Sequence, residues 1–144
     1  MPADNDLSTL DATAQAALVR DGKVSPLELV DAAIERIEKV NPEINAVIHE
    51  RFEAARREAA GTLPDGPFRG VPFLLKDLGI AMAGDPHHMG SRFLKEAGFR
   101  AAEDTALARR FLAAGLVVVG RTTRRSNARG STGCGWGHRP GVPW

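Results

Sequence analysis

Two apolar runs separated by a helical segment constrain the fold of this chain most strongly. The second run, LVVVG at 116–120, is too apolar to alternate between two faces, which is typical of a strand buried on both sides. The first run, GVPFLLKDLGIAMAG at 70–84, reads as extended chain. Between them lies a helical pattern with Asp104 as its expected N-cap and Gly115 as its stop. Strands joined through a helix pair in parallel, so the sequence predicts a βαβ unit.

Helical patterns fill the chain before these runs. A first helix is expected over about 11–22, where a glycine ends it as a left-handed C-cap. The residues SPLE at 25–28 form a capping box with proline in the first turn, and they open a second helix that is expected to end before Asn41-Pro42. A third helix is expected over 45–60.

The predicted fold class is therefore α/β, with N-terminal helices followed by a βαβ piece of a mixed sheet. The chain of 144 residues is long enough for one ordinary domain. Both strands read as interior strands of a larger sheet, so we expect them to carry edges without partners. Unpaired edges of this kind favour aggregation.

The composition changes sharply near residue 121. Residues 121–144 hold five arginines and no acidic residue, and taking those five from the 19 basic residues leaves 14 against 18 acidic ones, a charge of −4 for 1–120. A segment rich in Arg, Gly and Pro cannot bury enough apolar area to offset its ordering entropy. We therefore divide the chain into an ordered part, 1–122, and a tail, 123–144, expected to be disordered or read out of frame.

Several protein classes are disfavoured by the composition. No apolar run is long enough to span a membrane, and the N-terminus MPADNDLSTLDATA is acidic and lacks the apolar core of a secretory signal. Cys134 is the single cysteine, which excludes an internal disulfide and fits the reducing cytoplasm. The sequence therefore predicts a cytoplasmic location.

The first apolar run ends on a charged side chain, Lys76, followed by Asp77. Burial lowers the pKa of a lysine, and a neutral amine is an effective general base. Alternatively, Lys76 pairs with an acid or extends to solvent, and the spacing alone favours this structural role. Asp77 either orients Lys76 and the turn after it or only ends the strand.

Three segments resemble the amidase signature family. GPFRGVPFLLKD at 66–77 resembles the stretch that carries the catalytic lysine of these enzymes. Residues 101–122 are similar to the helix and strand that follow it, and 11–48 look like the N-terminal helices of the family. The resemblance extends from residue 10 to about 122. Within the family, the sequence most resembles the branch that includes 6-aminohexanoate cyclic-dimer hydrolases.

The resemblance implies an incomplete amidase-signature fold and a Ser–cis-Ser–Lys triad. In such enzymes the neutral lysine takes a proton from a bridging serine, which activates the nucleophilic serine for attack on an amide carbonyl. Lys76 is the residue that matches the triad lysine. The implied substrate is a small linear or cyclic amide, and no cofactor, metal, nucleic acid or membrane is implied.

The two serines of the triad do not match any segment. The family carries its nucleophile in a G-G-S-S-G-G-S-like segment downstream. Ser8 and Ser25 read as loop and helix-cap residues. Ser91, in HHMGSRFL, resembles a family loop near the active site and is a candidate lining residue. Ser131 and Cys134, in GSTGCG, lack the family's glycine pattern and the serine that should precede it.

The resemblance is lost near Thr123, where the composition also changes. A shifted reading frame in GC-rich DNA would produce such a change. We therefore expect a chain of amidase lineage that lacks both serines and is inactive alone. The alternative is a non-catalytic module that needs a partner chain.

Two other features have mainly structural interpretations. His87 and His88 are adjacent, so in extended chain they face opposite ways, and no carboxylate or cysteine follows at ligand spacing. The arginines of the tail have no aromatic residues interleaved with them, which disfavours nucleic-acid binding.

Overall fold

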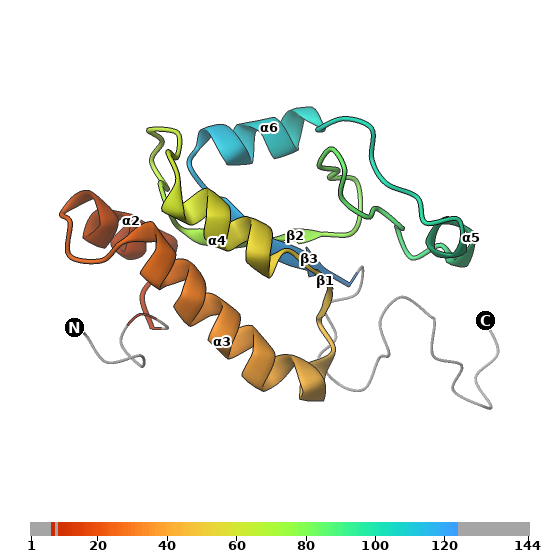
Figure 1. Cartoon of the computed structure of the whole chain (residues 1–144), viewed down its shortest axis with the longest axis horizontal. Coiled ribbons are helices and arrows are strands. Elements are labelled where there is room, and N and C mark those ends of the chain that lie inside the picture. The colour runs from red at the N-terminus through yellow and green to blue at the C-terminus, as the bar shows by residue number, and fades with distance from the viewer. Residues whose placement is uncertain (1–6, 8, 124–144) are drawn as a thin grey trace.

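The computed structural model describes residues 7 and 9–123 (Figure 1). Its elements, in chain order, are α2 (Ala12–Arg20), α3 (Pro26–Ile44), β1 (Val47–Glu50), α4 (Phe52–Ala60), β2 (Pro72–Lys76), α5 (Arg92–Glu96), α6 (Ala106–Ala113) and β3 (Val117–Thr122). Four parts of the sequence-based interpretation lie outside the described residues: Ser8, Ser131, Cys134 and the tail after Thr123.

The three strands form one mixed sheet in the order β1-β3-β2. β3 is central, and it pairs antiparallel with β1 and parallel with β2. The parallel pair confirms the predicted βαβ unit. The expectation of unpaired edges was wrong for β3, which has a partner on each side. Among the described residues β2 has one partner and lies at the edge of the sheet, as expected.

Helices cover both faces of the sheet (Figure 1). Val117 and Val119 of β3 pack on one side with residues of α3 and α4: Val30, Ile34, Ala55 and Ala59. Val118 packs on the other side with Leu75 of β2 and Ala108 of α6. Because successive side chains of a strand point to opposite faces, burial on both faces explains the unbroken apolar run of β3.

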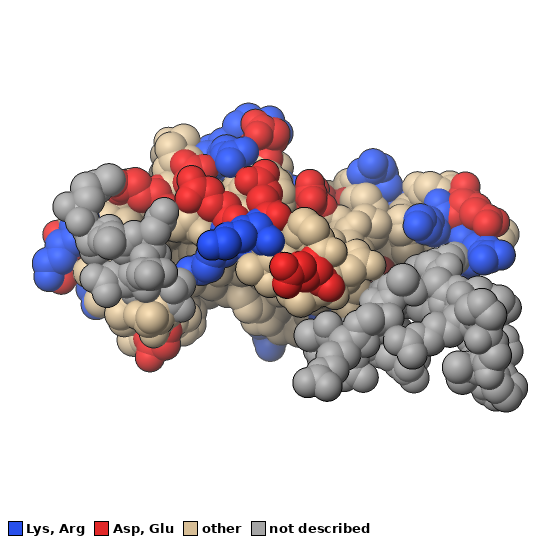
Figure 2. Space-filling model, turned by 90° about the horizontal axis from the view of Figure 1, so that it is seen from below, with Lys and Arg blue, Asp and Glu red and all other residues tan. Residues whose placement is uncertain are grey.

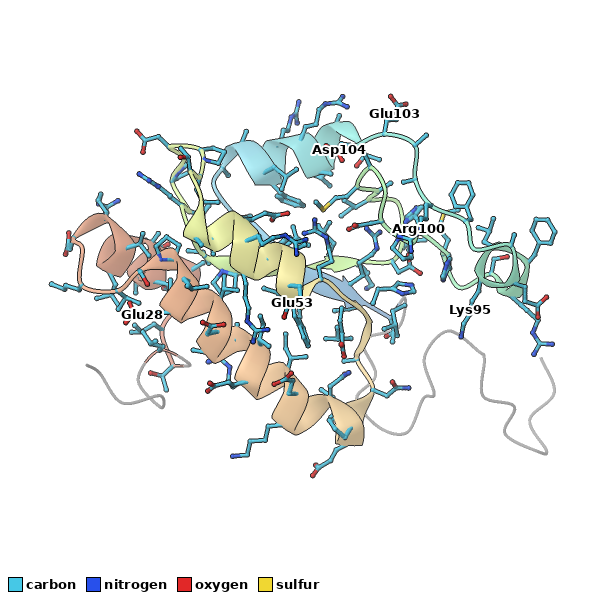
Figure 3. All side chains as sticks on the ribbon, in the orientation of Figure 1. Glu28, Glu53, Lys95, Arg100, Glu103 and Asp104 are labelled. Carbon is cyan, nitrogen blue, oxygen red and sulfur yellow. The ribbon has the colours of Figure 1, made fainter. Side chains whose placement is uncertain are left out.

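The expected capping box at the start of α3 is confirmed. The side chain of Asp11 accepts from the first turn of α2, and Ser25 and Glu28 form the capping box of α3. The expected cap of α6 was wrong by one residue, because the hydroxyl of Thr105 accepts from its first turn. The Asp104 carboxylate instead accepts from the Ala83 N–H at 2.7 Å, so it ties the start of α6 (Figure 3) to the preceding loop.

We expected α3 to end before Asn41-Pro42, but the helix continues to Ile44. Pro42 lies in the last turn, where the missing N–H costs a single backbone hydrogen bond. The side chain of Asn41 accepts from Val47 N at 2.8 Å and donates to Val47 O at 3.0 Å, so it holds the end of the helix against β1. This pairing favours the longer helix.

The expected third helix over 45–60 was wrong in its first part. Asn45 has a left-handed backbone conformation, φ 48°, that ends α3, and the next residues form β1. α4 begins at Phe52. The β-branched pair Val47 and Ile48 fits a strand, and this strand pairs antiparallel with β3. The long-range partner therefore overrides the local helical pattern.

The expected extended run over 70–84 is a strand only at Pro72–Lys76, and turns follow it. A short helix that the sequence pattern did not indicate, α5, begins after Ser91. α5 projects to one side of the sheet (Figure 1). The segment between β2 and β3 therefore holds two helices joined by loops.

The face in Figure 2 carries acidic and basic side chains interspersed, and neither sign forms a continuous patch there. Among the described residues, no helix is both long and apolar enough to cross a membrane.

Gly115, which follows α6, provides a test of this packing. Its φ is +89°, and an added Cβ would lie 2.6 Å from the Cα of Arg69. We expect Gly115→Ala to lower the free energy of unfolding by about 3 kcal/mol or more, because backbone strain and a clash act together. Gly22 is the matched control, since its φ is +67° and nothing lies within 4 Å of an added Cβ. Gly22→Ala should cost about 1–2 kcal/mol. Urea denaturation of both variants measures the difference, and equal losses would contradict the close approach of the two loops.

Candidate active site

Lys76 is the last residue of β2, at the end of the parallel strand pair. Its side chain is exposed, whereas its neighbours Leu75 and Asp77 are buried. The expectation that the strand buries this lysine was therefore wrong for the described residues. The alternation along β2 explains the difference, because Leu75 packs against α6 and Lys76 points to the opposite face.

The backbone of Lys76 is held from β3. The N–H of Asp77 donates to the carbonyl of Thr122 at 3.0 Å, and the guanidinium of Arg121 donates to the carbonyl of Lys76 at 3.4 Å. Both polar groups of the peptide unit that joins Lys76 to Asp77 thus have partners on the neighbouring strand. This unit sets the direction in which the Lys76 side chain leaves the sheet.

Asp77 is fully buried, and its carboxylate does not pair with Lys76. It lies 3.6 Å from Nε of Arg121, which is also fully buried. Its two oxygens accept from the N–H groups of His88 at 3.2 Å and Met89 at 3.0 Å. The carboxylate therefore joins the end of β2 to β3 and to the following loop.

The guanidinium of Arg121 also contacts the loop directly. It donates to the carbonyl of Ile80 and lies 2.8 Å from Nδ1 of His87. A guanidinium only donates, so this contact is a hydrogen bond when the His87 imidazole is neutral and protonated at Nε2, whereas a proton on Nδ1 would face the Asp77 carboxylate 3.4 Å away. We refer to Asp77, His87 and Arg121 as the buried cluster.

Burial and charge set the protonation of the buried cluster. Burial lowers the pKa of His87, and Arg121 lowers it further, against the opposing effect of Asp77. Burial also lowers the pKa of the Arg121 guanidinium, which Asp77 partly offsets. Arginine nevertheless stays charged in proteins, so the cluster contains one ion pair and one neutral imidazole.

A second pair of histidines lies beside the cluster. The rings of His49 on β1 and His88 are 4.7 Å apart in an edge-to-face arrangement. Burial lowers the pKa of His49, and the nearby His88 adds to this effect. Within the part of the chain that the structure describes, no three His, Cys, Asp or Glu residues are placed to hold a metal ion.

Arg51 and Arg100 hold the same loop at other points. Nε of Arg51 lies 2.9 Å from the carboxylate of Asp85, and Nη1 donates to the carbonyl of Val118 at 2.8 Å. Arg100, labelled in Figure 3, donates to the carbonyl of Gly84 at 2.7 Å. The loop after Lys76 is therefore attached to β3, to α4 and to the segment before α6.

The two serines of the described residues both cap helices. The hydroxyl of Ser25 accepts at the start of α3, and that of Ser91 accepts from Leu94 N at 3.4 Å at the start of α5. The structure does not bring either serine into hydrogen-bond contact with Lys76. The described residues therefore provide a candidate base but no matching nucleophile.

Sequence reasoning missed Arg121 and His87. Arg121 is the first residue of the basic segment 121–144, so its composition grouped it with the tail. His87 was interpreted as a loop residue without a ligand role. A usable signal was the position of Arg121 directly after LVVVG, because a charge that continues a buried strand requires a buried partner.

A separate apolar groove of about 440 Å³ lies between α3 and the sheet. Its walls include Ile37, Val40 and Ile44 of α3 and Pro72 and Leu74 of β2. None of the residues of the buried cluster lines it.

The buried ion pair provides a stability test. Asp77→Asn removes the negative charge and leaves Arg121 charged and buried, so we expect a loss of about 3–5 kcal/mol in the free energy of unfolding. Asp31→Asn is the matched control, because Asp31 pairs with Arg56 at 2.8 Å while both side chains stay more than a third exposed. That change should cost about 1 kcal/mol or less. Urea denaturation at neutral pH distinguishes the two, and a loss at Asp77 no larger than at Asp31 would contradict the role of the pair.

The lowered pKa values of His49 and His87 predict acid sensitivity. Both groups ordinarily titrate near 6.5, and the fold holds each of them lower, so the unfolded chain binds more protons just below that pH. The stability from the neutral imidazoles is present above 6.5 and is lost as the pH falls below it. We expect urea denaturation to show a lower free energy of unfolding at about pH 5.5 than at about pH 7.5. The double variant His49→Gln/His87→Asn should show a shallower pH dependence, and an unchanged one would contradict this assignment.

Comparisons with known proteins show what this chain is similar to. The Amidase family model matches residues 28–134, a range that extends beyond the change in composition at residue 121. The chain is 51% identical over 112 residues to 6-aminohexanoate-cyclic-dimer hydrolase of Paenarthrobacter ureafaciens, covering 78% of this chain and 22% of that enzyme. It is 39% identical over 120 residues to putative amidase AmiC of Mycobacterium tuberculosis, covering 83% of this chain and 25% of that protein.

Solved structures give the same result. A structure of 6-aminohexanoate cyclic dimer hydrolase complexed with substrate matches with a TM-score of 0.74 and 50% identity, over 79% of this chain and 23% of that one. A bacterial aryl acylamidase of the amidase signature family matches with a TM-score of 0.69 and 29% identity, over 78% and 25% of the two chains. The chain thus spans about a fifth of the first relative's length, corresponds to an N-terminal part of these enzymes, and belongs to the amidase signature family.

Proposed function

We propose that this chain supplies the general-base lysine, Lys76, of a site that hydrolyses the C–N bond of a linear or cyclic amide. The observation that carries the proposal is the position of Lys76 at the end of the parallel strand pair, with its backbone held by β3 and its side chain free of ion pairs among the described residues. A lysine paired with a carboxylate would be held charged and could not accept a proton.

The proposed reaction follows the family mechanism. The neutral amine of Lys76 takes a proton from a serine outside the described residues, and that serine takes the proton of a second, nucleophilic serine. The nucleophile attacks the amide carbonyl, the amine leaves with a proton, and an acyl-enzyme remains. Water then attacks the ester and releases the acid. Burial by further protein would favour the neutral amine that this step requires, because desolvation disfavours the charged form of a lysine.

We further propose that residues 1–122 form the amidase-like part and that the 144-residue chain does not hydrolyse amides by itself. Both serines among the described residues are engaged as helix caps, and Lys76 remains exposed. An alternative function, a non-catalytic module that joins a separate chain, is favoured by the edge position of β2. The two are compatible, because a partner chain could supply both serines.

A chimeric enzyme tests the role of Lys76. Residues 9–122 of this chain replace the matching segment of the Paenarthrobacter ureafaciens 6-aminohexanoate-cyclic-dimer hydrolase, to which the chain is 51% identical. We expect the chimera to hydrolyse the cyclic dimer. Lys76→Ala should lower kcat by about 10²–10⁴-fold, the usual contribution of a general base. Lys39→Ala is the control, because Lys39 is exposed on α3 and should have no effect.

Two results would contradict these proposals. A Lys76→Ala chimera as active as its parent would exclude the general-base role. Hydrolysis of the cyclic dimer by the purified 144-residue chain, if lost in Lys76→Ala, would exclude the proposed inactivity.

A further inference from the structure

The proposed reaction uses Lys76 but leaves the buried cluster of Asp77, His87 and Arg121 without a role. All three side chains are buried, with exposed fractions of 0%, 7% and 0%. Burying two opposite charges has a desolvation cost that an apolar pair of similar size would avoid. Stability alone is therefore a poor explanation for this choice of residues.

The buried cluster acts directly on the backbone next to Lys76. The guanidinium of Arg121 donates to the Lys76 carbonyl. The next residue of the same strand, Thr122, accepts from the Asp77 N–H through its carbonyl. The Lys76–Asp77 peptide unit therefore cannot rotate without breaking contacts with β3. Rotation of that unit would redirect the Cα–Cβ bond of Lys76.

The buried cluster also fixes the loop that follows. The Asp77 carboxylate accepts from the N–H groups of His88 and Met89, and Arg121 donates to the Ile80 carbonyl. Met89 has φ 52°, a left-handed conformation that is strained for a residue with a side chain. The bond from Asp77 to the Met89 N–H helps to hold this strained turn in place.

We propose that Arg121 and His87 are positioning residues, which act through Asp77 to fix the direction of Lys76 and the loop beside it. This inference rests on the proposed function in that it treats Lys76 as the reacting group. His87 completes the arrangement by accepting from Arg121 at 2.8 Å, which keeps the guanidinium turned toward the loop.

The arrangement requires a neutral His87. The charged and titratable groups that face its ring are Asp77 after β2, Arg121 on β3 and His88 on the same loop. Protonation turns Nδ1 into a donor that faces the donors of Arg121, so the contact is lost. Asp77, 3.4 Å from Nδ1, would attract the protonated ring and would be drawn from its bonds to the loop. The cluster should therefore loosen as the pH falls.

Hydrogen exchange measured by NMR on the full 144-residue chain tests this. The reporters are the backbone N–H groups of His88 and Met89, and the reference is Val117, which donates to the Val71 carbonyl at 2.9 Å at the other end of the strand pair. After correction for intrinsic rates, we expect protection of the reporters to fall by about three- to tenfold between about pH 7.5 and about pH 5.5, the effect of losing one hydrogen bond. Protection of Val117 should change less.

Matched variants separate the role of the imidazole from simple packing. His87→Asn retains an acceptor oxygen near the position of Nδ1 but does not titrate, so the reporters should stay protected at both pH values. His87→Leu has no acceptor, so protection should be low at both. Lys76→Ala should leave the pH response unchanged, which makes this result independent of the catalytic role of Lys76.

The chimeric enzyme provides the second readout. His87→Leu should lower kcat with KM unchanged, and His87→Asn should retain kcat. Three results of the exchange experiment would overturn the proposal. They are reporter protection that does not depend on pH in the unaltered chain, a loss of protection at Val117 equal to that of the reporters, and a pH response that persists in His87→Asn. An unchanged kcat of the His87→Leu chimera would also overturn the proposal. If Lys76→Ala is inactive in the same chimera, that result would leave the proposed function standing.

Discussion

The buried ion pair between Asp77 and Arg121 is the contact on which the functional end of the sheet depends. Two charges in a desolvated position are stabilising only when further hydrogen bonds satisfy them. Asp77 obtains these from the loop after β2. Nη2 of Arg121 contacts the carbonyls of Lys76 and Ile80 and Nδ1 of His87, whereas its buried Nε and Nη1 have no hydrogen-bond partner among the described residues and face Asp77 only as an ion pair. The pair therefore specifies one arrangement of strand end and loop, because alternative arrangements leave a buried charge without partners.

The contrast in burial between Lys76 and its neighbours has a separate cause. The pleat of β2 places Leu75 and Asp77 on the buried side and Lys76 on the other. The chain thus determines the position and direction of the lysine but not its solvation. A lysine acts as a base near neutral pH when its surroundings remove water, and those surroundings must come from protein beyond the described residues. Direction and desolvation are separate contributions, and the proposed positioning role of the buried cluster concerns the first.

The elements that sequence reasoning predicted correctly are those that depend on neighbouring residues. The capping box at Ser25, the stop at Gly115 and the apolar β3 have local causes. The expected helix over 45–60 failed because β1 is stabilised by pairing with β3, about seventy residues later in the chain. The motif singled out Lys76 as a candidate but not Arg121 or His87, because their contacts join strand and loop and no spacing within one segment reveals them.

The positions of the exposed features are consistent with one another. β2 is at the edge of the sheet, Lys76 ends that strand on its exposed side, and Pro72 and Leu74 of the same strand line the apolar groove beneath α3. By contrast, β3 is paired on both sides and covered on both faces. Under the proposed function, β2 is therefore the edge at which further protein would lie beside Lys76, whereas β1 forms the opposite edge of the sheet. An added strand along β2 would satisfy the free backbone groups of the edge, and the same approach would bring it to the end of the strand from which Lys76 extends.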